Sequence, residues 1–155
     1  DFAIREWTTD REQISRYIMK LAEKTGRRLR SHDFQAHGVY LGLAFDDGNW
    51  WGKGKKSKAT IYSTQEIYAH LMRLFNMVSF PAKCTHVNIA VFNVEPASPV
   101  QLGLFDGTRL DTRSLARASD KINDRYGEFT LVPAKMANMK HVIIKRVPFG
   151  SVRDI

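Results

Sequence analysis

Four lysines lie within six residues, and their spacing suits the binding of a polyanion. They are Lys53, Lys55, Lys56 and Lys58, separated only by glycine and serine. Ammonium groups this close repel one another unless an anion screens them. The phosphates of a nucleic acid would provide that screening, so the cluster favours nucleic-acid binding. The alternative is a solvated sheet edge, where lysines block aggregation.

The net charge of the chain points the same way and is unevenly distributed. The 155 residues carry 24 Lys and Arg against 16 Asp and Glu, a net charge of +8. Residues 1–63 hold 12 cations against 8 anions, residues 64–106 hold 2 against 3, and residues 107–155 hold 10 against 5. Two basic blocks around a near-neutral middle indicate a polyanionic partner, with nucleic acid first and an anionic membrane surface second.

A second motif, Gln101-Leu102-Gly103-Leu104-Phe105, suits a protein partner. It follows two prolines and precedes Asp106-Gly107, a turn signal. Large apolar side chains flanked by loop residues are poorly placed for a core, so they favour docking on another molecule. The motif resembles the peptides that bind bacterial sliding clamps, with the Gln101 amide in a polar pocket and the apolar side chains in a cleft. The alternative is a short strand that packs on the domain itself.

Groups that could catalyse a reaction or hold a metal are scattered along the chain. The histidines are His32, His37, His70, His86 and His141. They lack the spacing of metal ligands, and Asp46-Asp47 precede Gly48-Asn49, as in a plain turn. No glycine-rich phosphate loop precedes a helix. We therefore expect no catalytic residue, metal or cofactor here, and no chemistry from this chain alone.

The single cysteine and the absence of long apolar runs bear on location. Cys84 lies in an apolar, strand-like run, which predicts a buried, inert thiol and excludes an internal disulfide. The sequence has no signal peptide and no apolar run of membrane-spanning length. We expect a cytoplasmic protein that makes no membrane contact. The chain starts at Asp1, so we expect it to be a piece of something longer.

The periodicity of apolar residues predicts alternating strands and helices. Thr9 with Glu12, and Ser63 with Glu66, form capping-box patterns that begin two helices. Strict alternation predicts strands whose buried residues include Ala59 and Ile61. The expected strands span residues 2–8, 39–45, 56–62 and 84–94, and the expected helices run from Thr9 to about Arg30 and onward from Ser63.

The order β-α-β-β-α-β predicts an α+β fold, a ferredoxin-like two-layer sandwich with a C-terminal helical extension. Both helices should cover one face of the sheet and leave the other bare. We expect a domain at residues 1–96, a linker at 97–106 and an extension at 107–155. The extension should contain a helix over 112–126, solvated and laced with ion pairs, or else a second contact to DNA or clamp.

The bare face should carry cations, small residues and aromatic rings. Small central residues let a ligand approach the backbone, and lysines supply phosphate contacts. Tyr40, Tyr62 and Phe92 could instead stack on unpaired bases. Trp50 and Trp51 should lie on a hairpin tip at 49–54. The residues expected on the bare face are Arg5, Trp7, Tyr40, Gly42, Ala44, Lys56, Lys58, Thr60, Tyr62, Asn88, Ala90 and Phe92.

Taken together, several segments resemble one known family. They include the helix end Gly26-Arg27-Arg28-Leu29-Arg30, the basic hairpin 53–60, the strand 87–94, the pentapeptide 101–105 and the run 118–127. In this order they resemble the little-finger domain of Y-family translesion DNA polymerases, of the bacterial DNA polymerase IV and V type. The resemblance covers roughly residues 4–132. Gly103 departs from the usual small polar residue, and Trp50-Trp51 are unusually bulky.

The resemblance implies a domain that holds primer–template DNA from the major groove and is tethered to the sliding clamp. Nucleotidyl transfer, with two magnesium ions, would belong to a palm domain of the parent polymerase, so no catalytic residue carries over. Double-stranded primer–template DNA and a bacterial sliding clamp are the expected partners of a monomer. DNA binding then falls to Arg5, Lys53, Lys55, Lys56, Lys58 and Thr60, and clamp binding to Gln101, Leu102, Gly103, Leu104 and Phe105.

Two other interpretations stay open. The same domain could belong to a catalytically inactive relative that connects the clamp to repair factors. Alternatively, the chain could be a single-stranded RNA-binding module in which the clamp-like pentapeptide is fortuitous.

Overall fold

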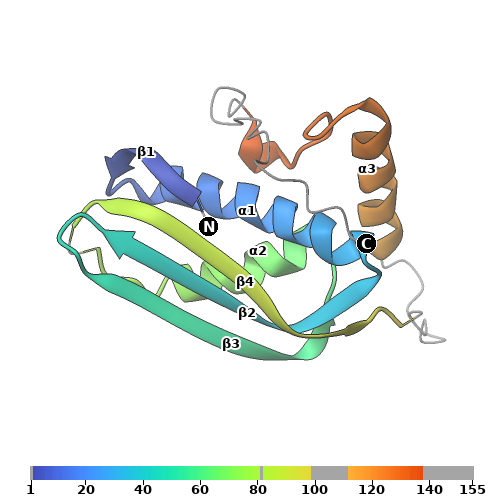
Figure 1. The fold of residues 1–155 in the computed structure, drawn as a ribbon, viewed down its shortest axis with the longest axis horizontal. Helices are drawn as coiled ribbons and strands as arrows, with labels where there is room; N and C mark the ends of the chain where they lie inside the picture. The colour runs from blue at the N-terminus through green and yellow to red at the C-terminus, as the bar shows by residue number, and fades with distance from the viewer. Residues whose placement is uncertain (1, 81, 99–111, 138–155) are drawn as a thin grey trace, which may run out of the picture.

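The computed structural model describes residues 2–80, 82–98 and 112–137, which form a four-stranded sheet, two covering helices and a C-terminal helical segment (Figure 1). The predicted order β-α-β-β-α-β and the two-layer α+β arrangement are confirmed. The elements are β1 (Phe2–Thr8), α1 (Arg11–Ser31), β2 (Phe34–Phe45), β3 (Trp50–Ile61), α2 (Thr64–Phe75), β4 (Cys84–Pro96), α3 (Thr112–Tyr126) and the short 3₁₀ helix η1 (Ala134–Met136).

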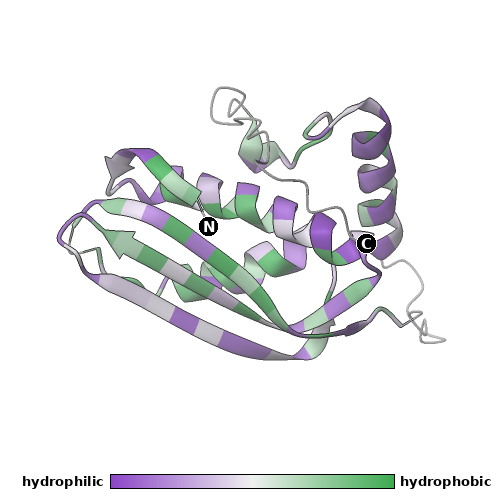
Figure 2. Cartoon of the chain, viewed as in Figure 1, coloured by the Kyte–Doolittle hydropathy of each residue, from purple (hydrophilic) through white to green (hydrophobic). Residues whose placement is uncertain are grey.

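The sheet is antiparallel throughout, in the order β1-β4-β2-β3. Each helix therefore connects two strands that have a third strand between them. β2 and β4 form the centre and carry more of the hydrophobic residues, whereas β3 is the more hydrophilic edge (Figure 2). Both α1 and α2 pack on one face of the sheet (Figure 1). Their apolar stripes bury Ile18 and Leu71 completely, in the same core cluster as Leu41 of β2.

The two sheet-covering helices begin differently. At α2 the predicted capping box is present: the Glu66 amide donates to Ser63 Oγ at 3.2 Å, and the Ser63 amide donates to Glu66 Oε2 at 2.9 Å. At α1 the prediction of Thr9 was wrong, because Asp10 is the N-cap and accepts from the Glu12 amide at 2.8 Å. With Asp10 as N-cap, Glu12 is one position short of the capping-box position, and its carboxylate binds Lys135 at 2.8 and 2.9 Å instead.

The central hairpin is longer than predicted. β2 begins at Phe34, so His37 lies in a strand rather than a loop, and β3 begins at Trp50 rather than near Lys56. The run from Gly52 to Lys55 has poor strand propensity, but pairing with β2 satisfies its backbone groups. Only the turn 46–49 remains outside the strands, with Gly48 at a φ of +83°.

An irregularity in β3 overturns two predicted orientations. Ala36 pairs with Ile61 and Gly38 pairs with Lys56, so four residues of β3 oppose one residue of β2. A bulge of this kind interrupts the alternation of faces. Ala59, predicted in the core, is therefore exposed. Tyr62, predicted on the bare face, lies beyond the end of β3 and is only 1% exposed.

The C-terminal segment packs along α1 on the side away from the sheet. α3 stands at the C-terminal end of α1, and the chain then runs back to η1, nearer the N-terminal half of α1 (Figure 1). Met136 is 2% exposed and belongs to the core cluster. The predicted bounds of α3 are confirmed, and so is its end, where Gly127 has a φ of +107° and its amide donates to Asn123 O at 3.0 Å.

Candidate nucleic-acid interface

The open face of the sheet, on the side opposite α1 and α2, is identified by register. Val39, Leu41 and Leu43 of β2 are fully buried toward the helices. Residues directly opposite one another in antiparallel strands share a face. The even-numbered positions therefore face outward: residues 38–44 of β2, 50–56 of β3 and 86–92 of β4. This places most of the predicted set there: Tyr40, Gly42, Ala44, Lys56, Asn88, Ala90 and Phe92.

The four lysines of the basic hairpin are divided between the two faces of β3. Lys53 and Lys55 pair with Leu41 and Val39, so they lie on the helix side. The Lys53 ammonium is 3.9 Å from the sulfur of Met77, just beyond α2. Lys56 pairs with Gly38 and lies on the open face, and Lys58 lies in the bulge. All four are exposed, so the cluster straddles the sheet edge.

The positive charge at this edge of the sheet affects His70 of α2. Burial lowers the pKa of His70, and the positive charges of Arg73 and Lys55 lower it further. Among the described residues, His70 Nδ1 is buried and has no hydrogen-bond partner. The lowered pKa favours the neutral imidazole.

Arg5 and Thr60, also predicted to contact DNA, occupy different surroundings. Arg5 is exposed on β1, the sheet edge opposite β3. Thr60 is half-buried, and its hydroxyl accepts from Arg113 of α3 at 3.2 Å. The predicted DNA-binding residues therefore occupy both edges of the sheet. Among these residues, Thr60 contributes a hydrogen bond to α3 within the described part of the chain.

The same helix covers Tyr62, so this ring is unavailable for base stacking. Arg117 Nε donates to the Tyr62 hydroxyl at 2.9 Å, and the Arg113 guanidinium lies 4.7 Å from the ring centroid. α3 is thus more than the solvated helix that we expected, because two of its arginines dock on the end of the hairpin. This contact brings together residues more than 50 positions apart, which no local pattern reports.

Ion pairs hold α3 against the C-terminal end of α1. The Arg30 guanidinium binds both oxygens of Asp120, at 2.6 and 2.8 Å, with the Arg30 side chain only 3% exposed. Arg27 binds Asp124 at 2.8 Å. The ion pairs that we expected on this helix are therefore made with α1, and the basic end of α1 is largely neutralised.

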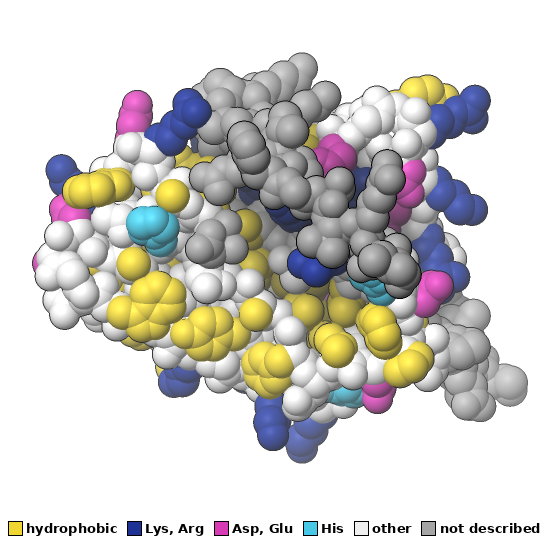
Figure 3. Space-filling model, in the orientation of Figure 1, with side chains coloured by type: hydrophobic (Ala, Val, Ile, Leu, Met, Phe, Trp, Pro, Cys, Tyr) yellow, Lys and Arg dark blue, Asp and Glu magenta, His cyan; other side chains and the backbone are white. Residues whose placement is uncertain are grey.

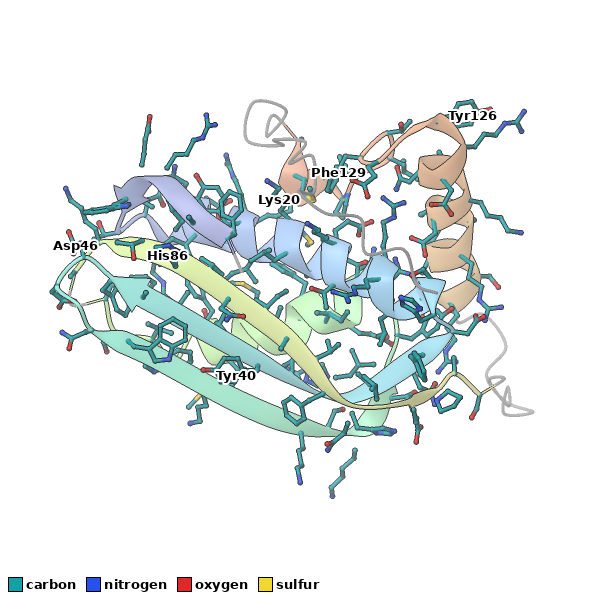
Figure 4. The ribbon with its side chains drawn as sticks, in the orientation of Figure 1. Lys20, Tyr40, Asp46, His86, Tyr126 and Phe129 are labelled. Atoms are coloured by element: carbon teal, nitrogen blue, oxygen red, sulfur yellow. The ribbon has the colours of Figure 1, made fainter. Side chains whose placement is uncertain are left out.

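Trp50, Tyr40 and Phe92 form an aromatic strip on the open face; the sequence predicted Tyr40 and Phe92 there but placed Trp50 on a hairpin tip. Trp50 lies over Gly42 and Gly52, and the other two rings lie near Gly54. Figure 3 shows hydrophobic side chains in a row over this part of the sheet, and Figure 4 shows Tyr40 lying along the strands. The glycines at every second position of β3 were the available signal, because glycine in a strand often marks a close approach.

The remaining predictions concern the cysteine, metal binding, membrane-spanning helices and the clamp-like pentapeptide. Cys84 is fully buried, as predicted, and burial raises the pKa of its thiol to about 11. In the described ranges, His, Cys, Asp and Glu side chains form no group of three that could hold a metal. No helix of those ranges is long and apolar enough to cross a membrane. The clamp-like pentapeptide 101–105 lies outside the described residues.

In the part of the chain that the structure describes, fold and site define the class: a small α+β domain whose helices leave one sheet face uncovered, with exposed cations at its two edges. Comparison with known proteins then gives the family. Residues 3–104 match the family described as the impB/mucB/samB family C-terminal domain, and the chain belongs to this family. The resemblance to the little-finger domain of Y-family DNA polymerases is thereby confirmed.

Relatives and a solved structure agree with this assignment. The chain is 26% identical over 122 residues to DNA polymerase IV of Clostridium acetobutylicum, covering 77% of this chain and 31% of that protein. It is 26% identical over 141 residues to DNA polymerase IV of Desulfatibacillum aliphaticivorans, covering 85% and 36%. The chain thus spans about a third of the length of these relatives.

The fold also matches a solved structure described as a complex of the beta-clamp processivity factor and the little finger domain of PolIV. The TM-score is 0.51 at 17% identity, over 67% of this chain and 94% of that one. At this identity the match supports the architecture alone.

Proposed function

We propose that this chain is the DNA-holding and clamp-tethering domain of a translesion DNA polymerase. The observation that carries the proposal is the open face of an antiparallel sheet, with exposed cations at both edges, in a chain of this polymerase family. Synthesis itself, with Mg²⁺ as the resemblance implies, is proposed for a longer parent protein. No residue of this chain is assigned a catalytic role.

DNA binding is proposed to use the two edges and the open face between them. Phosphates would be contacted at both edges of the sheet, by Lys56 and Lys58 on β3 and by Arg5 on β1. Such contacts position a duplex without reading its sequence, as a polymerase that accepts any template requires. Affinity should then depend steeply on salt, because each neutralised phosphate releases counterions.

The division of the lysines provides the test. Binding to a fluorescent primer–template duplex is measured by anisotropy from 50 to 200 mM salt. If Lys56 and Lys58 each contact one phosphate, K56Q/K58Q should reduce the slope of log K against log salt by about 1.8, at roughly 0.9 per contact. The matched variant K53Q/K55Q removes the same charge from the helix side and should change the slope by less than about 1.

Either of two results would refute this docking geometry. One is a larger slope change for K53Q/K55Q than for K56Q/K58Q, which would place DNA over the helix side of β3. The other is a slope unchanged in both variants, which would remove the hairpin from the interface.

Clamp tethering is proposed for the pentapeptide Gln101–Phe105, supported by its resemblance to clamp-binding peptides and by the solved complex of a related fold with a clamp. Tethering would raise the effective concentration of a weak DNA binder at the replication site. Q101A/L104A should abolish binding to an immobilised bacterial sliding clamp while DNA affinity is retained. L115A, which truncates an exposed leucine of α3, is the control. Unchanged clamp affinity in Q101A/L104A would exclude the motif.

A further inference from the structure

The aromatic strip of Trp50, Tyr40 and Phe92 depends on glycines in the strands beneath the rings. A Cβ at Gly38 would collide with the Phe92 ring, one at Gly42 with the Trp50 ring, and one at Gly52 with the Tyr40 hydroxyl. Only glycine at these positions lets the rings approach the backbone so closely. Neighbouring rings share glycines, because Trp50 and Tyr40 both lie over Gly52 while Tyr40 and Phe92 both lie near Gly54. The three rings therefore form one continuous strip.

The strip is accessible from the open side of the sheet. Trp50 is 53% exposed, and Tyr40 and Phe92 are half-buried. Rings that lie against the backbone on one side can offer the other side to a ligand. Successive outward positions on a strand are about 6.7 Å apart, so the strip extends over several such steps.

The charges around the strip favour an anionic ligand. The outward-facing positions 38–44 of β2, 50–56 of β3 and 86–92 of β4 include no carboxylate. Lys56 faces outward opposite Gly38, beside the Phe92 end of the strip, and Lys58 follows in the bulge. A ligand that matches both features needs flat apolar faces on an anionic backbone.

Single-stranded DNA has both properties. In a duplex the base faces are stacked on one another and only the base edges reach the grooves. Unpaired bases can instead stack on aromatic side chains, and neighbouring cations hold the backbone. The aromatic strip therefore favours unpaired bases over paired ones.

We propose that Trp50, Tyr40 and Phe92 bind unpaired bases of single-stranded DNA by stacking, with Lys56 and Lys58 on the adjacent phosphates. This rests on the proposed function, since it takes the open face to be the DNA-binding face. It adds that the domain grips the unpaired template strand as well as the duplex. The single-stranded arm would follow the strip, and the duplex arm would contact the edge cations.

The test compares three labelled ligands on the 155-residue chain: a dT15 oligomer, a blunt 15-base-pair DNA duplex and a U15 RNA. W50A should weaken dT15 binding roughly tenfold, within the range that one stacked base contributes. Its effect on the blunt duplex should stay below about twofold. W50F keeps a stacking ring and should retain most of the dT15 affinity. Y126A removes an aromatic ring that is 64% exposed on α3, outside the sheet, and should change neither.

Tryptophan fluorescence gives a second, local readout. The chain has three tryptophans, Trp7, Trp50 and Trp51. In W7F/W51F only Trp50 remains, and dT15 should quench its emission. In W50F/W51F only Trp7 remains, which lies outside the strip, and dT15 should quench its emission much less than that of Trp50. Circular dichroism melts of every variant establish that each one is folded before binding is compared.

Failure of this proposal and failure of the proposed function give different results. If the chain binds duplex with the expected salt slope but W50A and Y126A alter dT15 binding equally, stacking is excluded and DNA holding stands. If W50A weakens duplex as much as dT15, the strip is part of the duplex interface. If U15 binds more tightly than dT15, the assignment to DNA is wrong. If no DNA binds, the proposed function itself is excluded.

Discussion

Removing the Asp120 carboxylate should destabilise the protein far more than removing its neighbour one turn along α3. The Arg30 guanidinium keeps two further contacts, at 3.3 Å each, to Tyr62 O and Thr64 Oγ1, but Asp120 accepts its two shortest hydrogen bonds. In D120A a buried cation would lose the anion that neutralises it. Cations in this position do not reach water without local unfolding.

The expected loss of unfolding free energy depends on how deeply each carboxylate is buried. Breaking a fully buried ion pair on one side costs about 3–5 kcal/mol. Asp120 is 18% exposed, so some water already screens the pair and we expect about 2–4 kcal/mol for D120A. Asp124 also pairs with an arginine, Arg27, but is 70% exposed. For D124A we therefore expect no more than about 1 kcal/mol.

The assay is urea unfolding followed by circular dichroism, with hydrogen exchange of the α3 amides in parallel. If α3 detaches before the sheet domain unfolds, its amides will exchange early and the cost will appear there. If the domain unfolds as a unit, the urea concentration at the midpoint will fall while the dependence of the unfolding free energy on urea, the m value, stays unchanged. Equal costs for D120A and D124A would show that the Arg30 pair does not hold α3 in place.

Three further predictions concern other buried groups. With a pKa near 11 against an ordinary 9.0, Cys84 should react with iodoacetamide at pH 8 at least about a hundredfold more slowly than an exposed thiol, and rapidly after denaturation in urea. Because burial lowers the pKa of His70, the unfolded state takes up the proton first as pH falls below about 6.5. Stability should therefore drop below that pH in the native chain and drop less in H70N, as measured by thermal melts from pH 8 to 5. M136A should cost about 2–5 kcal/mol in urea unfolding, since the residue is 2% exposed in the core; a cost below about 1 kcal/mol would detach η1 from the core.

Local patterns in the sequence determined most of the helices and strands of this protein. The Ser63 capping box, the bounds of α3 and the alternation along β4 are encoded within a few neighbouring residues. Each satisfies backbone groups or buries one face through its own neighbours. The family resemblance was accessible for the same reason, because it depends on the order of such segments.

Only the tertiary structure decided which residues share a surface. The bulge opposite His37 reverses the predicted orientation of Ala59. The strand order brings Trp50 of β3 into one strip with Tyr40 of β2 and Phe92 of β4. The covering of Tyr62 by Arg117 joins positions 55 apart in the sequence. Faces depend on register, and register depends on partners supplied by distant parts of the chain. Spacing along the chain therefore predicted Tyr40 and Phe92 on the open face, but not that Trp50 joins them in one strip.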